Sequence, residues 1–430
     1  MEKINLPPDW IETRTLEARW PAAVSGLINL VVLFIATLIV WWVCFSNAGI
    51  FKLYTPLLGF SLVLWTLLII LWQVQLFDFW PLRRNFLVST HPLLKGIVLS
   101  AMTIATYLAL IIGVVFFLIG KFGITYFNWH SLMQYGELGQ DALSTRETAS
   151  WALLSLSVPF FIISVFMLLG IGKDLFSPLV QPRMGIANLS LITTISIPLF
   201  FLFFHPHLGS MFYPAQVYTA VPPWWQSLAM TNSAEYSLGV LFCTVLGIFY
   251  TIHLWDGRPW NLIDKQPWKF IVLVVGGLCL GLLIFYVQLY MMNYFWDEAY
   301  IGGQNESNFG WRYSHTVTMG NFFVVPAMIL NFFFGRVFEG LTLLAKGLIK
   351  TGITLAAGLL FAWAYYMWAP VILGVVPGIS HPSENASAFL LLIMNLVLIQ
   401  FYFMDGWPGY RLMDSDVYEN EKKSRTLVEV

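Results

Sequence analysis

The chain has 430 residues, of which 58% are hydrophobic and 17% aromatic, whereas only 10% are charged. Soluble domains carry roughly 25% charged residues, so a water-soluble fold of this length could not hide so much apolar surface. The 22 Lys and Arg residues nearly balance the 23 Asp and Glu residues, and this net charge of -1 excludes a nucleic-acid binder. The composition therefore predicts an all-α, polytopic integral membrane protein.

Ten continuous apolar runs approach or exceed the roughly 20 residues that a helix needs to cross a bilayer. Because the runs do not alternate with polar residues, helices are favoured over a β-barrel. In chain order the runs are 22–45, 57–77, 97–118, 151–171, 191–204, 238–254, 270–292, 318–334, 353–375 and 388–404. We predict one ten-helix membrane domain, residues 21–407, between an N-terminal tail of residues 1–20 and a C-terminal tail of residues 408–430.

The positive charges predict the orientation of these helices. Eighteen of the 22 Lys and Arg residues fall in the two tails and the even-numbered gaps between runs, and four fall in the odd-numbered gaps. Cytoplasmic loops carry the excess of Lys and Arg, so both tails are expected in the cytoplasm of a plasma-membrane protein. The first run begins too late and is too long for a cleaved signal peptide.

Three even-numbered runs end on a similar signature: Asp78-Phe79-Trp80-Pro81, Asp256-Gly257-Arg258-Pro259-Trp260 and Asp405-Gly406-Trp407-Pro408. Pro stops a helix and Trp favours headgroup depth. Such a signature is typical of any helix that leaves the membrane. It is also what a degenerate internal repeat of helical hairpins would produce, and the sequence leaves both interpretations open.

Few residues in the chain suit metal or haem chemistry. The three cysteines lie far apart in apolar runs, and of seven histidines only His253 falls within a run. Facing histidines for an embedded haem and cysteine sets for zinc or iron–sulfur clusters are therefore missing, and we expect the chain to bind no haem or metal. None of the ten runs contains Lys, Arg, Asp or Glu, which weighs against an ion-driven transporter.

Polar and aromatic residues gather in the odd-numbered, outer loops. Residues 205–236 contain four prolines and the pair Trp224-Trp225 but no Lys or Arg. An aromatic wall with a few hydrogen-bonding groups suits a flat, weakly polar ring such as a quinone, although an ordinary aromatic belt is an equally simple interpretation. The candidate quinone-binding residues are His205, His207, Ser210, Tyr213, Trp224, Trp225 and Gln226.

Charged residues in the other outer loops are candidates for docking a partner protein. Asp297, Glu298, Arg312 and His315 lie between the seventh and eighth runs, and Glu384 precedes the tenth. Each could equally be an ordinary solvated loop residue. Together they make the outer side a candidate docking surface.

Several collinear fragments resemble the polysulfide-reductase membrane subunit (NrfD-like) family. They are His91-Pro92-Leu93, the stretch from His205 to Met211, Pro223-Trp224-Trp225-Gln226-Ser227, Gly320 with Pro326, and Pro382-Ser383-Glu384. The chain departs from the family pattern where Pro206 replaces a Ser and where no Glu precedes Gly320.

The resemblance implies a membrane anchor that passes electrons between a quinone and an iron–sulfur subunit docked on the outer face. A larger catalytic subunit, often a molybdenum enzyme, would lie beyond it. In that arrangement His205, His207 and Gln226 would bind the quinone oxygens, and Tyr213, Trp224 and Trp225 would flank its ring.

Two other functions remain open from the sequence. A solute transporter fits ten helices and the prolines Pro159, Pro198 and Pro326 within runs. A structural anchor of a redox complex without a working quinone site fits the departures from the family pattern.

Overall fold

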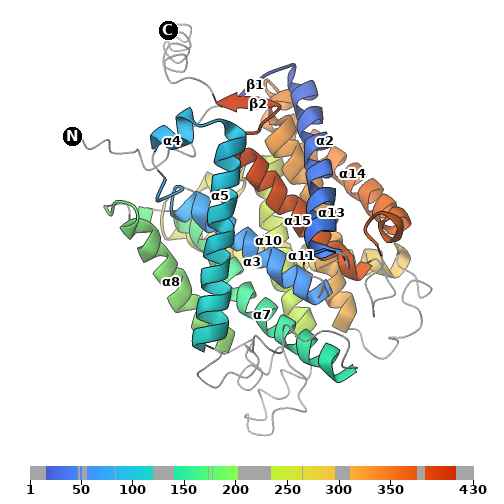
Figure 1. Cartoon of the computed structure of the whole chain (residues 1–430). Helices are drawn as coiled ribbons and strands as arrows, with labels where there is room; N and C mark the ends of the chain where they lie inside the picture. The colour runs from blue at the N-terminus through green and yellow to red at the C-terminus, as the bar shows by residue number, and fades with distance from the viewer. Residues whose placement is uncertain are drawn as a thin grey trace, which may run out of the picture.

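The computed structural model describes residues 16–46, 49–50, 56–82, 84–119, 140–172, 174–176, 178–201, 234–263, 265–295, 310–374 and 383–412. These residues are almost entirely helical (Figure 1). Within them, nine helices are long and apolar enough to cross a membrane, which confirms an all-α protein with many membrane spans. The run 191–204, predicted as the fifth span, corresponds to a helix that begins earlier, Arg183–Leu199, and is not among the nine.

The helices form two sets. The peripheral helices are α2 (Ala22–Val40), α5 (Pro92–Tyr107), α8 (Arg183–Leu199), α11 (Trp268–Phe295) and α14 (Leu343–Ile372). The central helices are α3 (Pro56–Leu71), α7 (Gln140–Phe166), α10 (Ala234–Trp255), α13 (Gly310–Phe334) and α15 (Ser383–Leu398). π-Helical turns continue several of them, at Trp41–Phe45, Trp72–Leu76, Leu108–Ile119, Met167–Ile171 and Ile399–Phe403.

Short elements connect the helices and join the two ends of the described chain. They are α4 (Arg84–Ser89) and the 3-10 turns Asp174–Phe176, Trp260–Leu262 and Gly335–Phe338. Strands β1 (Leu16–Ala18) and β2 (Tyr410–Leu412) pair antiparallel, with Leu16 opposite Leu412. We call the face that carries these strands the terminal face and the opposite face the loop face.

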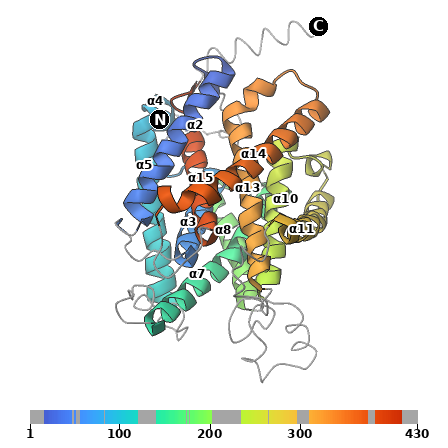
Figure 2. The same ribbon diagram turned by 90° about the vertical axis from the view of Figure 1, so that its right-hand side faces the viewer.

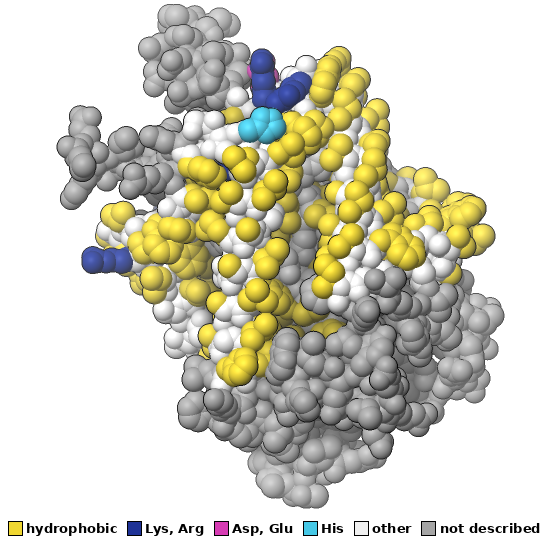
Figure 3. Space-filling view, in the orientation of Figure 1, with side chains coloured by type: hydrophobic (Ala, Val, Ile, Leu, Met, Phe, Trp, Pro, Cys, Tyr) yellow, Lys and Arg dark blue, Asp and Glu magenta, His cyan; other side chains and the backbone are white. Residues whose placement is uncertain are grey.

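Burial separates the two sets of helices. In the most apolar window of the spans formed by α2, α5, α11 and α14, 17–22% of the residues are buried, against 61–78% in the five central spans. Each peripheral helix buries a single stripe at helical spacing, such as Ser25, Gly26, Asn29, Leu33 and Thr37 of α2. The rest of its surface is apolar, as Figure 3 shows over α2 and α5, because it faces the hydrocarbon of the membrane.

The chain alternates between the two sets, so the described residues form five consecutive hairpins of one peripheral and one central helix. The central helices contact one another in the order α3, α7, α10, α13, α15 and back to α3, which closes a ring. Each peripheral helix packs over the central helices of the two preceding hairpins. α11 lies on α10 and α7, and α14 lies on α13 and α10. Figure 2 shows α11 beside α10 and α14 beside α13.

The same rule holds where the ring closes. α2, from the first hairpin, packs on α15 and α13 of the last two hairpins, and α5 packs on α3 and the end of α15. The ring is therefore pseudo-five-fold, which favours the internal repeat over a generic membrane-exit signature.

The exit signature forms a repeated turn at the terminal face. Asp78, Asp256 and Asp405 all adopt the left-handed conformation, with φ of 48°, 51° and 50°. The next residue in each turn donates its backbone N–H to a carbonyl six residues earlier, as Gly406 does to Gln400 at 2.8 Å. This turn caps the central helix and directs the carboxylate away from its own hairpin.

Each of these carboxylates binds the hairpin two places further around the ring. Asp405 pairs with Lys95 of α5, Asp256 with Lys346 of α14 at 2.8 Å, and Asp78 accepts from Gln181 before α8 at 3.0 Å. The remaining two hairpins make the equivalent link through backbone carbonyls. Gln266 donates to Gly170 at 2.6 Å, and Arg336 donates to Leu16.

Close packing repeats beside these links. A glycine in the first turns of a peripheral helix meets the residue just before the turn of a central helix. The pairs are Gly26 with Phe334, Gly96 with Met404, Gly185 with Phe77, and Gly347 with Trp255, and in α11 the sizes are reversed, with Phe270 against Gly170. These contacts fix a common register for the five peripheral helices.

The structure corrects the prediction that the spans hold no ionised side chain. α5 and α14 begin at Pro92 and Leu343, five and ten residues before the apolar runs that predicted them. The candidate spans therefore include Lys95, Lys346 and Lys350. Apolar runs find the helix middle, but buried lysines with partners extend these helices toward the terminal face.

Candidate functional site

The predicted quinone-binding residues His205, His207, Ser210, Tyr213, Trp224, Trp225 and Gln226 lie outside the described residues, as do Asp297 and Glu298. Arg312 and Glu384 lie in the first turns of α13 and α15, and their side chains are not described. His315 lies in α13 and is partly exposed. Residues 202–233 connect α8 to α10, and residues 296–309 connect α11 to α13. The ends of these four helices that flank the two segments lie at the loop face.

Aromatic side chains from three helices meet at this end of α10, α11 and α13. The ring of Tyr236 lies edge-on to Phe285 and Tyr313, with centroid separations of 5.2 and 5.4 Å. Phe285 in turn packs on Tyr286 and Tyr313 at 5.4 and 5.7 Å. We call Tyr236, Phe285, Tyr286 and Tyr313 the tyrosine cluster.

The tyrosine cluster presents paired hydroxyl groups beside the lipid. The hydroxyls of Tyr236 and Tyr286 are hydrogen-bonded at 2.9 Å. Tyr286 is 54% exposed on the lipid-facing side of the peripheral helix α11. A molecule dissolved in the membrane can therefore reach this pair of hydroxyls laterally.

Buried polar groups lie next to the cluster. Gln288 of α11 is 5% exposed, and its Oε1 lies 3.6 Å from the Sγ of Cys243. The same sulfur lies 3.7 Å from Oγ1 of Thr316, which donates to the carbonyl of Tyr313 at 2.6 Å. A ring bound at the tyrosine cluster would thus have polar neighbours on its protein side as well.

Small residues allow the three helices to approach closely here. A Cβ on Gly239 would lie 2.6 Å from the carbonyl oxygen of Tyr313 and 2.7 Å from the ring of Phe285. A Cβ on Gly281 would lie 2.6 Å from the backbone N of Thr244. Glycine at both positions lets α10 pack against α11 and α13, and this packing brings the aromatic rings together.

The tyrosine cluster offers hydrogen-bond donors without a charge. A phenol hydroxyl is a neutral donor at neutral pH, which suits a carbonyl oxygen and does not require an anionic ligand.

Sequence reasoning selected both outer loops but did not select these residues. Tyr236 ends the aromatic loop and Tyr313 lies in the next long loop, whereas Tyr286 and Gln288 were assigned to the last third of the apolar run 270–292. A signal was present, because Tyr286 and Gln288 are polar groups within an otherwise apolar stretch. Their convergence with Tyr236 and Tyr313 depends on helix packing, which the sequence does not display.

Within the described ranges no three His, Cys, Asp or Glu side chains are placed to hold a metal ion together. No family model, no curated protein and no solved structure matches this chain.

Proposed function

We propose that this chain is a quinone-interacting membrane subunit of an oxidoreductase complex. The observation that carries the proposal is the hydroxyl pair of Tyr236 and Tyr286, which is bounded by aromatic rings and open to the lipid. Quinones travel in the membrane interior and offer two carbonyl oxygens on a flat ring. Ligands of this kind bind in largely apolar sites with a few placed polar groups.

The tyrosine cluster also agrees with the outer loops chosen from the sequence. It lies where α10 begins and where α11 and α13 meet the loop face, next in the chain to the segments that hold the predicted quinone and partner residues. We propose that His205, His207 and Gln226 supply further hydrogen bonds and that Tyr213, Trp224 and Trp225 complete the aromatic wall.

The proposed topology has ten spans with both tails in the cytoplasm. α8 occupies the peripheral position of the third hairpin, where it packs on α7 and the end of α3. We therefore count α8 as a span as well, the fifth in chain order, which raises the number of spans from nine to ten. The excess of Lys and Arg on the terminal face would then place that face in the cytoplasm and the tyrosine cluster at the outer side.

The proposed partners follow from the chemistry. Oxidation of a quinol releases two protons and two electrons, so an electron acceptor must lie near the ring. We propose an iron–sulfur subunit docked on the loop face through Asp297, Glu298, Arg312, His315 and Glu384, with a larger catalytic subunit, such as a molybdenum enzyme, beyond it. The tyrosine hydroxyls would orient the quinone by hydrogen bonds to a carbonyl oxygen.

Quinone binding tests the proposal directly. The full chain in lipid nanodiscs is titrated with short-tail ubiquinone and, separately, short-tail menaquinone. We expect saturable binding of one of them, and Tyr236→Phe or Tyr286→Phe should raise its Kd by roughly 3- to 10-fold, the equivalent of one lost hydrogen bond. The matched control is Tyr107→Phe, because the buried Tyr107 hydroxyl has no hydrogen-bond partner within the described chain. Absence of binding, or equal Kd values in all variants, would overturn the proposal.

A further inference from the structure

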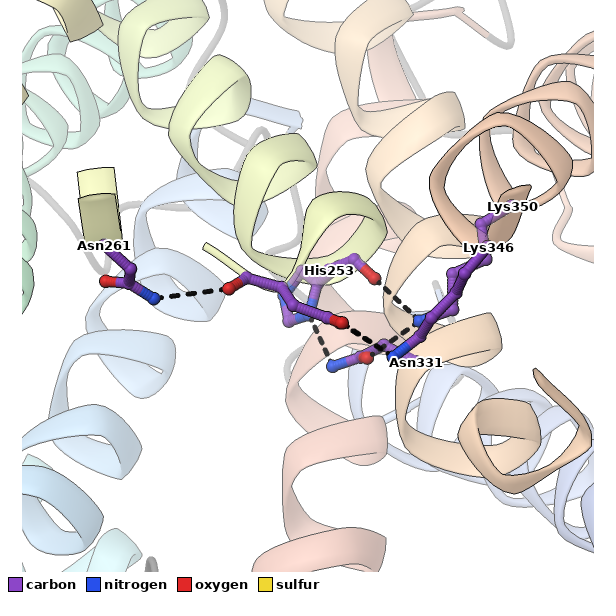
Figure 4. A network of polar contacts seen from close by, with 6 residues as sticks. His253, Asn261, Asn331, Lys346 and Lys350 are labelled. Carbon is purple, nitrogen blue, oxygen red and sulfur yellow. Dashed lines mark hydrogen bonds and ion pairs between the residues drawn. The ribbon is translucent and has the colours of Figure 1, made fainter. Parts of the chain in front are cut away.

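Lys350 is a fully buried amine near the terminal end of α14. Its Nζ lies 3.2 Å from the carbonyl oxygen of His253 and 3.3 Å from Oδ1 of Asn331 (Figure 4). The amide nitrogen of Asn331 lies 3.2 Å from Nδ1 of His253, which joins α10, α13 and α14 in one network. The side chains of Lys350 and His253 are 0% and 8% exposed.

The five hairpins provide an internal comparison for this lysine. Counting three residues beyond the packing position Gly26, Gly96, Gly185, Phe270 or Gly347 gives the equivalent residue in each peripheral helix. These residues are Asn29, Leu99, Asn188, Leu273 and Lys350, and all are buried. Four neutral side chains fill this position, so the packing of the ring does not require a cation there.

The ion pair that does repeat in this hairpin is made by a different lysine. Lys346 binds both carboxylate oxygens of Asp256, at 2.8 and 3.0 Å. This ion pair is equivalent to the pair of Lys95 with Asp405 in another part of the ring. Arg336, at the end of α13, pairs with Glu339. The titratable or charged groups that the packed elements bring toward Lys350 are thus His253, Asp256, Arg336 and Lys346, and within the described residues no carboxylate pairs with Lys350 itself.

The energetics of such a group point to proton exchange. The Nζ of Lys350 also lies over the ring of Phe338, 5.8 Å from its centroid. A buried ammonium held by neutral acceptors and an aromatic face still costs free energy relative to water, and losing its proton removes that cost. A carbonyl and an amide oxygen can accept from the ammonium, but neither fixes the charge as a carboxylate would. An amine that the fold does not need, in such surroundings, is suited to gain and lose a proton.

We propose that Lys350 is a proton-exchange site of the terminal face. In the uptake step Nζ of the neutral amine accepts a proton from water and becomes an ammonium that donates to His253 and Asn331; the release step is the reverse. His253 and Asn331 are positioning residues. This inference rests on the network alone and does not require quinone chemistry at the loop face.

The network has one exposed end and one buried end. Asp256 and Lys346 are 41% and 23% exposed, so water of the terminal face reaches the turn of α14 that precedes Lys350. One turn beyond Lys350, on the same stripe, the Oγ1 of Thr354 is buried and has no hydrogen-bond partner within the described chain. The polar stripe Lys346, Lys350, Thr354 therefore leads from the surface into the helix bundle.

The protonation state of Lys350 can be observed directly. The full chain is labelled with 15N-lysine in lipid nanodiscs, and the Nζ resonance missing in Lys350→Asn identifies the site. Asparagine is chosen because Asn29 and Asn188 already occupy the equivalent position in folded hairpins. We expect this resonance to change from the ammonium to the amine position, as the pH is raised, while an exposed lysine is still an ammonium.

The exposed Lys265 is the matched control, identified in the same way with Lys265→Asn. Its resonance is followed over the same pH range as that of Lys350. A Lys350 resonance that remains ammonium together with Lys265 would show a fixed structural cation. One that remains amine throughout would show a group that never takes up a proton, and either result overturns the proposal.

Discussion

Lys95 and Asp405 form an ion pair that is almost completely removed from solvent, with side chains that are 1% and 4% exposed. Replacing Lys95 by Met would leave the Asp405 carboxylate buried without its cation. We expect a loss of roughly 3–5 kcal/mol in the free energy of unfolding, because an uncompensated buried charge is far more costly than the pair. Denaturant unfolding of the purified chain in mild detergent measures this loss.

The control for this substitution is an exposed pair at the same face. Arg411 binds Glu17 at 2.8 Å, but the two side chains are 60% and 37% exposed, so Arg411→Met should cost less than about 1 kcal/mol. Adding Asp405→Asn to Lys95→Met should recover part of the lost stability, since it removes the orphaned charge. Equal effects of Lys95→Met and Arg411→Met would contradict the role given to burial.

Individual residues were the least predictable feature of the chain. Composition alone predicts that apolar side chains face lipid, since almost any of them serves there, but it does not say which ones do. The partners of buried polar residues are set by packing between distant segments: Lys95 and Asp405 are 310 positions apart, and Lys350 meets His253 across 97. One-dimensional patterns carry no signal for such pairs, although a lysine followed by Gly in both Leu94-Lys95-Gly96 and Ala345-Lys346-Gly347 indicates two related helix starts.

At the scale of the helix, small residues decide how closely neighbours approach. A Cβ on Gly281 would meet the backbone N and Cα of Thr244 at 2.6 Å, and backbone atoms cannot move aside. A Cβ on Gly96 would meet the flexible side chain of Met404, whereas one on Gly352 would meet nothing within 4 Å. We expect Gly281→Ala to destabilise by roughly 1–3 kcal/mol and Gly96→Ala by less.

Gly352→Ala serves as the internal standard for these two substitutions. It lies in open space on the exposed side of α14, so the higher helix propensity of Ala should stabilise the chain by up to about 1 kcal/mol. The midpoint of denaturant unfolding ranks the three variants. If Gly281→Ala is as harmless as Gly352→Ala, then α10 and α11 are not in the close contact described.

The existence of the helices was predictable, and their limits were less so. Hydrophobic runs located the nine spans that the structure describes because lipid demands a continuous apolar stretch. The runs placed the starts of α5 and α14 too late, because the buried lysines near their terminal ends interrupt the hydrophobic signal. The distinction between peripheral and central helices was also hidden, since both kinds are apolar on all sides.

For the molecule as a whole, the sequence contained the repeat but not its geometry. The three Asp-containing exits suggested degenerate hairpins, but only three of the runs carry this signature. The structure explains why the other two hairpins lack the Asp: they make the same link through backbone carbonyls. The carbonyl of Gly170 accepts from Gln266, and the carbonyl of Leu16 accepts from Arg336. A backbone carbonyl can be supplied by any residue, so that part of the repeat leaves no trace in the sequence.

A closed ring of hairpins should tolerate a change in where the chain starts. The described ends already meet, because β1 pairs with β2 and the backbone N–H of Arg19 donates to the carbonyl of Gly409 at 2.9 Å. We therefore expect a circular permutant that joins the two tails by a flexible linker, and begins at Lys265 between α10 and α11, to fold with a Tm close to that of the parent. Thermal unfolding monitored by circular dichroism provides the comparison.

A second permutant serves as the control. It is opened between Val245 and Leu246, which are 1% and 4% exposed in the middle of α10, and it should fail to fold because the cut lies in the core. Failure of both permutants alike would mean that the junction between the first and last hairpins depends on the native chain order, and the pseudo-symmetric ring would not be an assembly of equivalent units.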